Sequence, residues 1–248
     1  MILELDIGNS RIKWRYVEEN GGAVAERGSN ANLDELFAEL SVQSQPEWAR
    51  ASSVRNANIN AAVVEWIKSQ WGIDLRLARV TRRCAGVSNQ YEEPLRMGVD
   101  RWLAMLAAFN EAKGPCIVVD SGTALTVDVI DEDGAHKGGY IVPGLQLMGR
   151  SLEENTLIRL QGRGNGTTAL AHSTDDAVRS GCLAALVALI ERTAGSYDDR
   201  SVALFLSGGD ARMLSENLLL NAQVQCCIVE DLVMNGLAIA VPGPAIGS

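Results

Sequence analysis

The sequence of 248 residues has few basic side chains, few aromatic side chains and no long apolar run. It contains 22 Lys and Arg against 31 Asp and Glu, and its formal net charge is −9. Binding of duplex nucleic acid depends largely on clustered Lys and Arg, so this balance argues against nucleic acid as the main partner. Small anions are not excluded, because a few local donors can hold them.

Membrane and secretion signals are also missing from the sequence. The longest aliphatic run, residues 183–190, is far shorter than the roughly 20 residues that cross a membrane. The N-terminus lacks the basic and apolar regions of a signal peptide. The five cysteines are odd in number and form no CxxC pair, which favours buried free thiols over a disulfide framework or a zinc site. We therefore expect a cytoplasmic protein that does not bind a membrane.

Two distant stretches share one plan, in a chain whose 47% hydrophobic content indicates a globular core. Residues 3–17, LELDIGNSRIKWRYV, and residues 117–130, IVVDSGTALTVDVI, both read as apolar strand, Asp, Gly-containing turn and second strand. The shared plan predicts two similar α/β halves. We expect the two hairpins to face each other across a cleft.

Each of these turns can bind an anion, because glycine has no Cβ to keep the anion away from backbone N–H groups. Asn9, Ser10 and Thr123 add side-chain donors. Asp6 and Asp120 would repel a phosphate, and a cation between them and the phosphate removes this conflict, as Mg²⁺ does when carboxylates and phosphates hold it. The alternative is that both motifs are polar β-turns with capping Asp side chains.

Asp100 stands at the start of a predicted helix over residues 101–112. Phosphoryl transfer needs alignment, charge neutralisation and one group that receives the hydroxyl proton. A carboxylate at a helix start stays ionised and suits that last role. The alternative is a simple N-cap, and Arg101 could pair with Asp100 or bind a substrate oxygen.

The motifs DIGNS, GVDRW, DSGTALTVDVI, GGYIVPG, STDDAV and SGGDA occur in an order that resembles the type III pantothenate kinases. The stretch YEEPLRMGVDRW, residues 91–102, carries the most specific part of the resemblance. The resemblance implies an α/β fold of two duplicated ribonuclease H-like (actin-like ATPase) domains with a cleft between them. The domains would be residues 1–112 and 113–248, and the motif at 205–211 would bind adenosine.

The same resemblance implies an enzyme, a phosphotransferase that uses ATP to convert pantothenate to 4'-phosphopantothenate in the first step of coenzyme A biosynthesis. Asp100 would be the general base, and Asp120 would bind a monovalent cation, K⁺ or NH₄⁺, alongside Mg²⁺ on the nucleotide. The implied substrate-binding residues are Tyr91, Gly98, Val99, Asp100, Arg101 and Thr174. The implied ATP-binding residues are Asp6, Ile7, Gly8, Asn9, Ser10, Arg11, Ile12, Lys13 and Thr123. A homodimer is also implied, with Thr174 supplied across its interface.

Several residues have competing interpretations. Thr174 could belong to the cap of the long helix over 175–193, and that helix could form the dimer interface or lie inside one subunit. Arg11 and Lys13 could face ATP or solvent. Trp14, Trp66 and Trp102 have spacings compatible with a core and are expected to pack there. His136 and His172 have no partner pattern and are expected to be structural or on the surface. Asp128 and Asp131, after the second hairpin turn, are expected to be ordinary strand-end residues.

Two other functions are compatible with the fold. One is a kinase for another small polyol, against which the GVDR motif counts. The other is a nucleotide-dependent regulator without catalytic activity. Loss of Asp100 or of either hairpin Asp would favour the regulator, and the sequence retains all three.

Overall fold

A computed structural model describes residues 1–18, 23–161, 166–197 and 200–243 of the chain. The chain divides into two compact units, and each is described by itself. Unit 1 comprises Met1–Ala85, Tyr91–Ala107 and the segment that begins at Leu232, and unit 2 comprises Gly86–Gln90 and Ala108–Asp231. The domain boundary after residue 112 stays a prediction, and by this division the C-terminal segment belongs with unit 1. A turn expected at 20–22 lies outside the described residues, as do 162–165 of an expected loop at 161–170.

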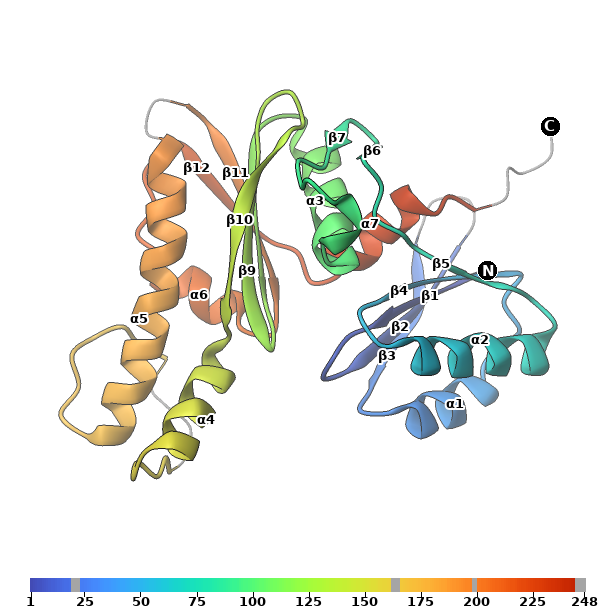
Figure 1. The fold of residues 1–248 in the computed structure, drawn as a ribbon, viewed down its shortest axis with the longest axis horizontal. Coiled ribbons are helices and arrows are strands. Elements are labelled where there is room, and N and C mark those ends of the chain that lie inside the picture. Colours follow the sequence, from blue (N-terminus) through green and yellow to red (C-terminus); the bar gives the residue numbers. More distant parts are fainter. Residues whose placement is uncertain (19–22, 162–165, 198–199, 244–248) are drawn as a thin grey trace. The chain divides into compact units, whose positions relative to one another are not determined.

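Unit 1 contains a five-stranded sheet in the order β3-β2-β1-β4-β5 (Figure 1). The β1–β2 and β2–β3 pairs are antiparallel, and the β1–β4 and β4–β5 pairs are parallel. The strands are β1 (Ile2–Ile7), β2 (Ile12–Val17), β3 (Val24–Asn30), β4 (Trp48–Ser53) and β5 (Leu75–Leu77). The helices that pack on this sheet are α1 (Leu33–Ser41), α2 (Ala57–Trp71) and α7 (Leu232–Ala240).

Unit 2 repeats this topology with a sheet in the order β10-β9-β8-β11-β12. The first two pairs are again antiparallel and the last two parallel, so the predicted duplication of the α/β plan is confirmed. The strands are β8 (Cys116–Ser121), β9 (Ala124–Ile130), β10 (His136–Pro143), β11 (Val202–Gly208) and β12 (Val224–Ile228). The helices are α4 (Leu145–Asn155), α5 (Thr174–Ala194), η2 (Gly195–Tyr197) and α6 (Ala211–Asn217).

Helix α3 (Val99–Ala112) and the short strands β6 (Arg83–Cys84) and β7 (Val87–Ser88) lie where the chain passes from unit 1 to unit 2. The 3-10 helix η1 (Pro94–Arg96) precedes α3. The sequence of residues 73–99 predicts a mostly irregular segment, but the structure has β5, β6, β7 and η1 within it. Strand β5 has only three residues, too few to show an alternating pattern. None of the helices in the described ranges is both long and apolar enough to cross a lipid bilayer.

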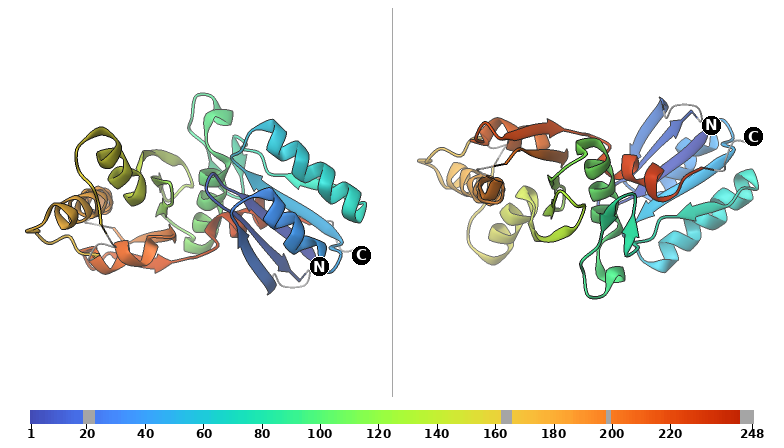
Figure 2. Two further views of the ribbon diagram at one scale, coloured as in Figure 1. Left: turned by 90° about the horizontal axis from the view of Figure 1, so that it is seen from below. Right: turned by 90° about the horizontal axis from the view of Figure 1, so that it is seen from above.

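The alternation of side chains along β1 builds the core of unit 1. Leu3, Leu5 and Ile7 are fully buried and pack with apolar residues of α1 and α2, among them Leu36 and Val63. Helices α1 and α2 lie side by side on this face of the sheet, whereas α7 contacts β1 and β4 (Figures 1 and 2). Unit 2 has a corresponding core, in which α5 packs against β8, β9 and β11. Helices α4 and α5 lie side by side.

The predicted interior of the chain needs two corrections. Asp128, which we expected to be a strand-end residue, is buried. It pairs with the buried His136, whose Nε2 lies 2.8 Å from Asp128 Oδ1, in agreement with the structural role expected for this histidine. Asp128 lies inside β9, and the pair forms where the register with β10 shifts. All five cysteines are free thiols, but only Cys116 is buried, and Cys226 and Cys227 are exposed. The tryptophans pack as predicted, Trp14 and Trp102 fully and Trp66 partly buried.

A buried charge network holds α7 on the sheet of unit 1. Glu4, with no exposed surface, accepts hydrogen bonds from Arg15 of β2 and Arg50 of β4. Arg15 also donates to Asn235 Oδ1 (3.1 Å), and Arg50 donates to Val241 O (2.7 Å) just beyond the end of α7. The two guanidinium groups carry one charge more than Glu4 neutralises. The carbonyl groups at the negative end of α7 offset that surplus.

We predict that Glu4→Gln destabilises the protein by about 3 kcal/mol or more, because it leaves two buried guanidinium groups without a carboxylate. The free energy of unfolding in urea measures this loss. Glu65→Gln, at an exposed position of α2, is the control and should change stability by less than about 0.5 kcal/mol. Equal stability of the two variants would show that the network does not hold α7.

Candidate active site

The first hairpin turn presents polar groups at its exposed tip. Gly8 N donates to Arg11 O (3.1 Å), and a Cβ on Gly8 would lie 3.0 Å from that same oxygen. Asn9, Ser10 and Arg11 are exposed, whereas Ile7 is buried and Asp6 is half-buried. The turn therefore has polar backbone and side-chain groups beside a carboxylate, and their predicted role in phosphate binding stays a prediction.

Arg11 is bound to the neighbouring strand. Its Nε donates to Ser29 Oγ (2.7 Å), and its Nη2 donates to Ser29 O (2.8 Å), so the guanidinium group is held against β3. Lys13 is half-buried and lies opposite Asp6 in the β1–β2 register. Both basic side chains thus flank the turn.

The second hairpin turn is braced by the Pro-Gly segment that ends β10. Gly122 N donates to Ala124 O (3.0 Å), and Gly144 N donates to Thr123 O (3.0 Å). A Cβ on Gly144 would collide with Gly122 O, so only glycine allows this approach. Thr123, at the tip of this turn, is exposed.

A second carboxylate, Asp210, is bonded to Ser121, the residue after Asp120, and the sequence interpretation missed it. Ser121, the last residue of β8, donates from Oγ to Asp210 Oδ2 (3.2 Å). Burial raises the pKa of Asp210, and the hydrogen bond from Ser121 partly offsets this. Gly208 has φ +90°, and a Cβ there would meet Ser121 O and lie 2.8 Å from Asp120 Oδ1. The Asp of the SGGDA motif was the available signal, but only the β8–β11 pairing places it at this edge.

Asp100 lies in the first turn of α3 rather than at its N-cap. Gly98 O accepts from Trp102 N (3.1 Å), and Asp100 Oδ1 accepts from Arg101 N (2.8 Å). A Cβ on Gly98 would lie 2.5 Å from Asp100 Oδ1, so glycine gives the carboxylate its room. Val99, the first residue of the helix, is half-buried. The N-cap interpretation of Asp100 is therefore wrong.

The side chains of Tyr91 and Arg101 contact each other directly. Arg101 Nη1 donates to Tyr91 Oη (2.9 Å), and its Cζ lies 5.8 Å from the centre of the tyrosine ring. Arg82 donates to the backbone carbonyls of Tyr91 (2.7 Å) and Glu92 (3.1 Å). The structure thus brings together Tyr91, Asp100 and Arg101, three of the predicted substrate-binding residues.

Thr174 does not cap α5. The N-cap is Ser173, whose Oγ accepts from Asp176 N (3.2 Å). Thr174 is exposed and lines a pocket of about 410 Å³ together with Arg159 and Arg179. The capping interpretation is wrong, and the substrate contact stays a prediction.

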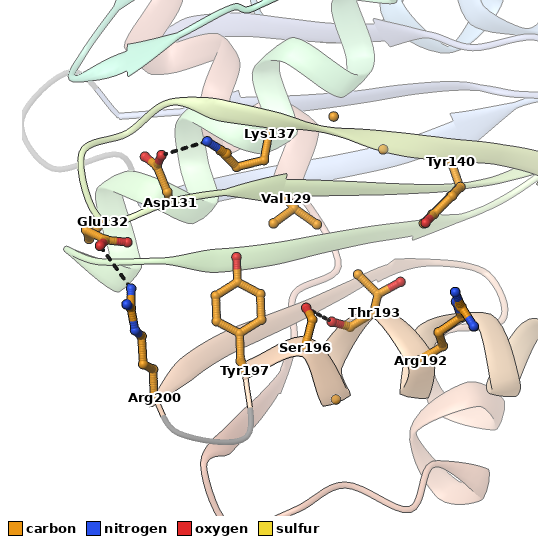
Figure 3. A pocket seen from close by; sticks show the side chains of 13 residues that line it. Val129, Asp131, Glu132, Lys137, Tyr140, Arg192, Thr193, Ser196, Tyr197 and Arg200 are labelled. Carbon is orange, nitrogen blue, oxygen red and sulfur yellow. Dashed lines mark hydrogen bonds and ion pairs between the residues drawn. The ribbon is translucent and has the colours of Figure 1, made fainter.

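A larger pocket of about 1350 Å³ lies between β10 and the end of α5 (Figure 3). Ion pairs border it, Lys137 with Asp131 (3.7 Å) and Arg200 with Glu132 (3.1 Å). Tyr197 also lines this pocket, and burial raises the pKa of its hydroxyl group. No predicted site residue lines this pocket, so its size does not mark it as the active site.

Comparison with known proteins decides the family. The profile of the type III pantothenate kinases matches residues 2–195. The chain is 38% identical to the type III pantothenate kinase of Pseudomonas fluorescens (strain Pf0-1), over 98% of this chain and 99% of the relative. It is 37% identical to that of Azotobacter vinelandii, over 99% and 100%. This chain belongs to the type III pantothenate kinase family.

Solved structures with low sequence identity share the fold. A candidate 2-dehydro-3-deoxygalactonokinase from Sinorhizobium meliloti aligns with a TM-score of 0.60 at 14% identity, over 97% of this chain and 98% of that one. The ethanolamine utilization protein EutJ from Carboxydothermus hydrogenoformans gives 0.52 at 14% identity, over 96% and 89%. Together with the duplicated topology, these alignments confirm the predicted class of two ribonuclease H-like domains.

We predict that Asp210→Asn raises the free energy of unfolding at pH 7 in buffer without K⁺ or Mg²⁺. The raised pKa means that the folded state binds the proton more tightly than the unfolded state. The free energy of unfolding therefore falls as the pH rises from the ordinary aspartate pKa of about 3.9 through the raised pKa of Asp210. The variant, which has no titrating group at this position, should not show this decrease.

Urea unfolding at a series of pH values measures this effect. Asp133→Asn, at an exposed position, should follow the wild-type profile. An Asp210→Asn protein that is less stable than wild type at pH 7 would contradict the assignment.

Proposed function

We propose that this chain transfers the γ-phosphoryl group of ATP to the primary hydroxyl group of pantothenate, with Mg²⁺ on the nucleotide. The product, 4'-phosphopantothenate, is the first intermediate of coenzyme A biosynthesis. Family membership supports the reaction class. The observation that carries the assignment is the cluster in which Tyr91, Arg101 and Asp100 are held together, with Gly98 leaving room beside the carboxylate.

In this proposal Asp100 is the general base. Its carboxylate orients the hydroxyl group of the substrate and accepts its proton as the bond to phosphorus forms. The Arg101 N–H donates to Asp100 Oδ1 (2.8 Å) and so fixes the orientation of this carboxylate. Arg101, nearly buried and fixed by Tyr91, presents a planar cation that suits the carboxylate of pantothenate. In this proposal Val99, the half-buried residue before Asp100, also contacts the substrate.

The first hairpin turn binds the phosphates of ATP in this proposal. Backbone N–H groups and the side chains of Asn9 and Ser10 donate to phosphate oxygens. Asp6 and Lys13 lie opposite each other at the base of the turn, in the pairing of β1 with β2. The next pair towards the turn, Ile7 and Ile12, is buried and anchors the turn to the core. In unit 2 the exposed hydroxyl group of Thr123 is a further phosphate donor.

We assign a monovalent cation, K⁺ or NH₄⁺, to the edge of unit 2 at Asp120. The Asp210 carboxylate, which lies at the end of the neighbouring strand, supports this assignment because both residues supply the hard oxygen ligands that such ions prefer. Bound positive charge would also offset the cost of ionising a half-buried Asp210.

We also propose a cytoplasmic homodimer in which Thr174 contacts the substrate of the partner subunit. Thr174 is exposed at the start of α5, and Arg159 and Arg179 stand beside it in the same pocket. The two arginines can bind an anionic substrate, and Asp175 and Asp176 line the same pocket. The other two functions, a polyol kinase and a regulator without catalytic activity, have no comparable support.

The direct test is a coupled assay of ADP release with ATP, Mg²⁺, K⁺ and pantothenate. We expect turnover that depends on pantothenate and that small polyols do not replace. Absence of ADP release with every monovalent cation would refute the enzyme, and turnover with a polyol alone would favour the alternative kinase.

We predict that Asp100→Asn lowers kcat by about a hundredfold to ten-thousandfold, because the amide cannot accept the hydroxyl proton. Binding of ATP and the circular dichroism spectrum should stay as in wild type. Glu111→Gln, on an exposed part of the same helix, is the matched control. Near-normal kcat in Asp100→Asn would remove this residue from the base role.

We predict that Asp120→Asn raises the K⁺ concentration for half-maximal activity by about tenfold or more, since one charged ligand is lost. Initial rates over a KCl series, at constant ionic strength, measure the shift. Asp133→Asn should respond to K⁺ as the wild type does. An unchanged response in Asp120→Asn would place the cation elsewhere.

A further inference from the structure

Arg55, which sequence motifs did not identify, reaches the first hairpin turn from the neighbouring strand. Its Nε donates to Gly8 O (2.8 Å), the carbonyl of the residue that opens the turn. Strand β4 runs parallel to β1 with Ser53 in register with Ile7, so the residues after Ser53 emerge beside the turn. A cation is thus fixed at the site that we propose for the phosphates.

The backbone around Arg55 is well anchored. Arg55 N donates to Ser53 Oγ (3.2 Å), and Val54 N donates to Ile7 O (3.2 Å). Immediately after it, Asn56 caps α2 by accepting from Ile59 N (3.1 Å). The side chain therefore starts from a defined position and does not have to be ordered by a ligand.

The outer end of the Arg55 side chain remains available. Only Nε is engaged, and within the described residues its two Nη atoms have no protein acceptor at hydrogen-bond distance. The residue is half-buried, which reduces the screening of its charge by water. A guanidinium group that is fixed through one nitrogen and open at the other two suits an anion with two oxygens, such as a phosphate.

The duplication of the fold provides an internal comparison. Ile7 is in register with Ser53, and its counterpart Ser121 is in register with Gly208. Arg55 in unit 1 lies two residues after Ser53, and Asp210 in unit 2 lies two residues after Gly208. Both therefore follow directly on the end of their strand. Each side chain bonds back to the hairpin of its own unit, Arg55 to Gly8 O and Asp210 to Ser121 Oγ.

Equivalent positions therefore carry opposite charges. The carboxylate lies at the hairpin to which we assign a cation, and the guanidinium lies at the hairpin to which we assign phosphate. A role limited to bracing the turn would need only the single bond from Nε, and it would leave the open end of a charged side chain without a purpose.

We propose that Arg55 is a phosphate-binding residue of the nucleotide site, contacting the ATP phosphates through its Nη atoms while Nε holds the turn in place. This inference rests on the proposed function for the identity of the anion. Its test uses ATP binding, which does not require turnover of pantothenate.

The experiment compares ATP and adenosine affinities by calorimetric titration, in the presence of Mg²⁺ and without pantothenate. Arg55→Gln can still donate to Gly8 O but carries no charge. We expect its Kd for ATP to rise by about tenfold to a hundredfold, with adenosine affinity unchanged. In steady-state assays the KM for ATP should rise and the KM for pantothenate should not. Arg76→Gln, at an exposed position of β5, should match wild type.

Arg55→Lys keeps the charge without the fork, and its ATP affinity should lie between those of wild type and Arg55→Gln. Arg55→Gln with wild-type ATP affinity, equal losses for ATP and adenosine, or Arg55→Lys no tighter than Arg55→Gln would each overturn the inference. If wild type binds ATP but does not phosphorylate pantothenate, the proposed function fails while this contact stands. If wild type turns over pantothenate and Arg55→Gln matches Arg76→Gln, only this contact fails.

Discussion

In each unit a central strand ends directly beside its parallel neighbour, and the phosphate and cation sites proposed above depend on that edge. The register fixes it, with Ile7 opposite Ser53 in unit 1 and Ser121 opposite Gly208 in unit 2. Because the carboxyl ends of parallel strands meet at one edge, a hairpin turn and the residues that follow a strand far away in sequence converge there. In unit 2 this edge needs glycine at position 208, because a Cβ there would collide with Ser121 O and because the residue has a positive φ.

The duplicated edges differ in charge, and this difference indicates a division of labour. The first carries basic groups beside the Asp6 carboxylate, with Arg11 held on the β3 side and Arg55 on the β4 side. The second carries Asp120 and Asp210. In our proposal one topology supplies phosphate donors in one copy and cation ligands in the other. Behind the first edge, the buried hydrogen bonds around Glu4 connect the sheet of unit 1 to α7.

Local patterns allowed the hairpins and most helices to be predicted, because glycine-containing turns, cap residues and apolar periodicity act over a few residues. The Tyr91–Arg101 segment was identified only through its resemblance to the type III pantothenate kinases. Contacts between distant segments were missed. Arg55 and Asp210 reach the hairpins only through the pairing of β4 with β1 and of β11 with β8. The buried His136–Asp128 pair likewise depends on an irregular register that no motif announces.

The most direct measurement is a crystal structure of the protein with a non-hydrolysable ATP analogue, Mg²⁺ and pantothenate. The account predicts that phosphate oxygens accept from the turn Gly8–Arg11 and that the primary hydroxyl group lies within hydrogen-bond reach of Asp100. Phosphates bound away from that turn, for example in the pocket between β10 and α5, with Asp100 remote from the hydroxyl group, would contradict it.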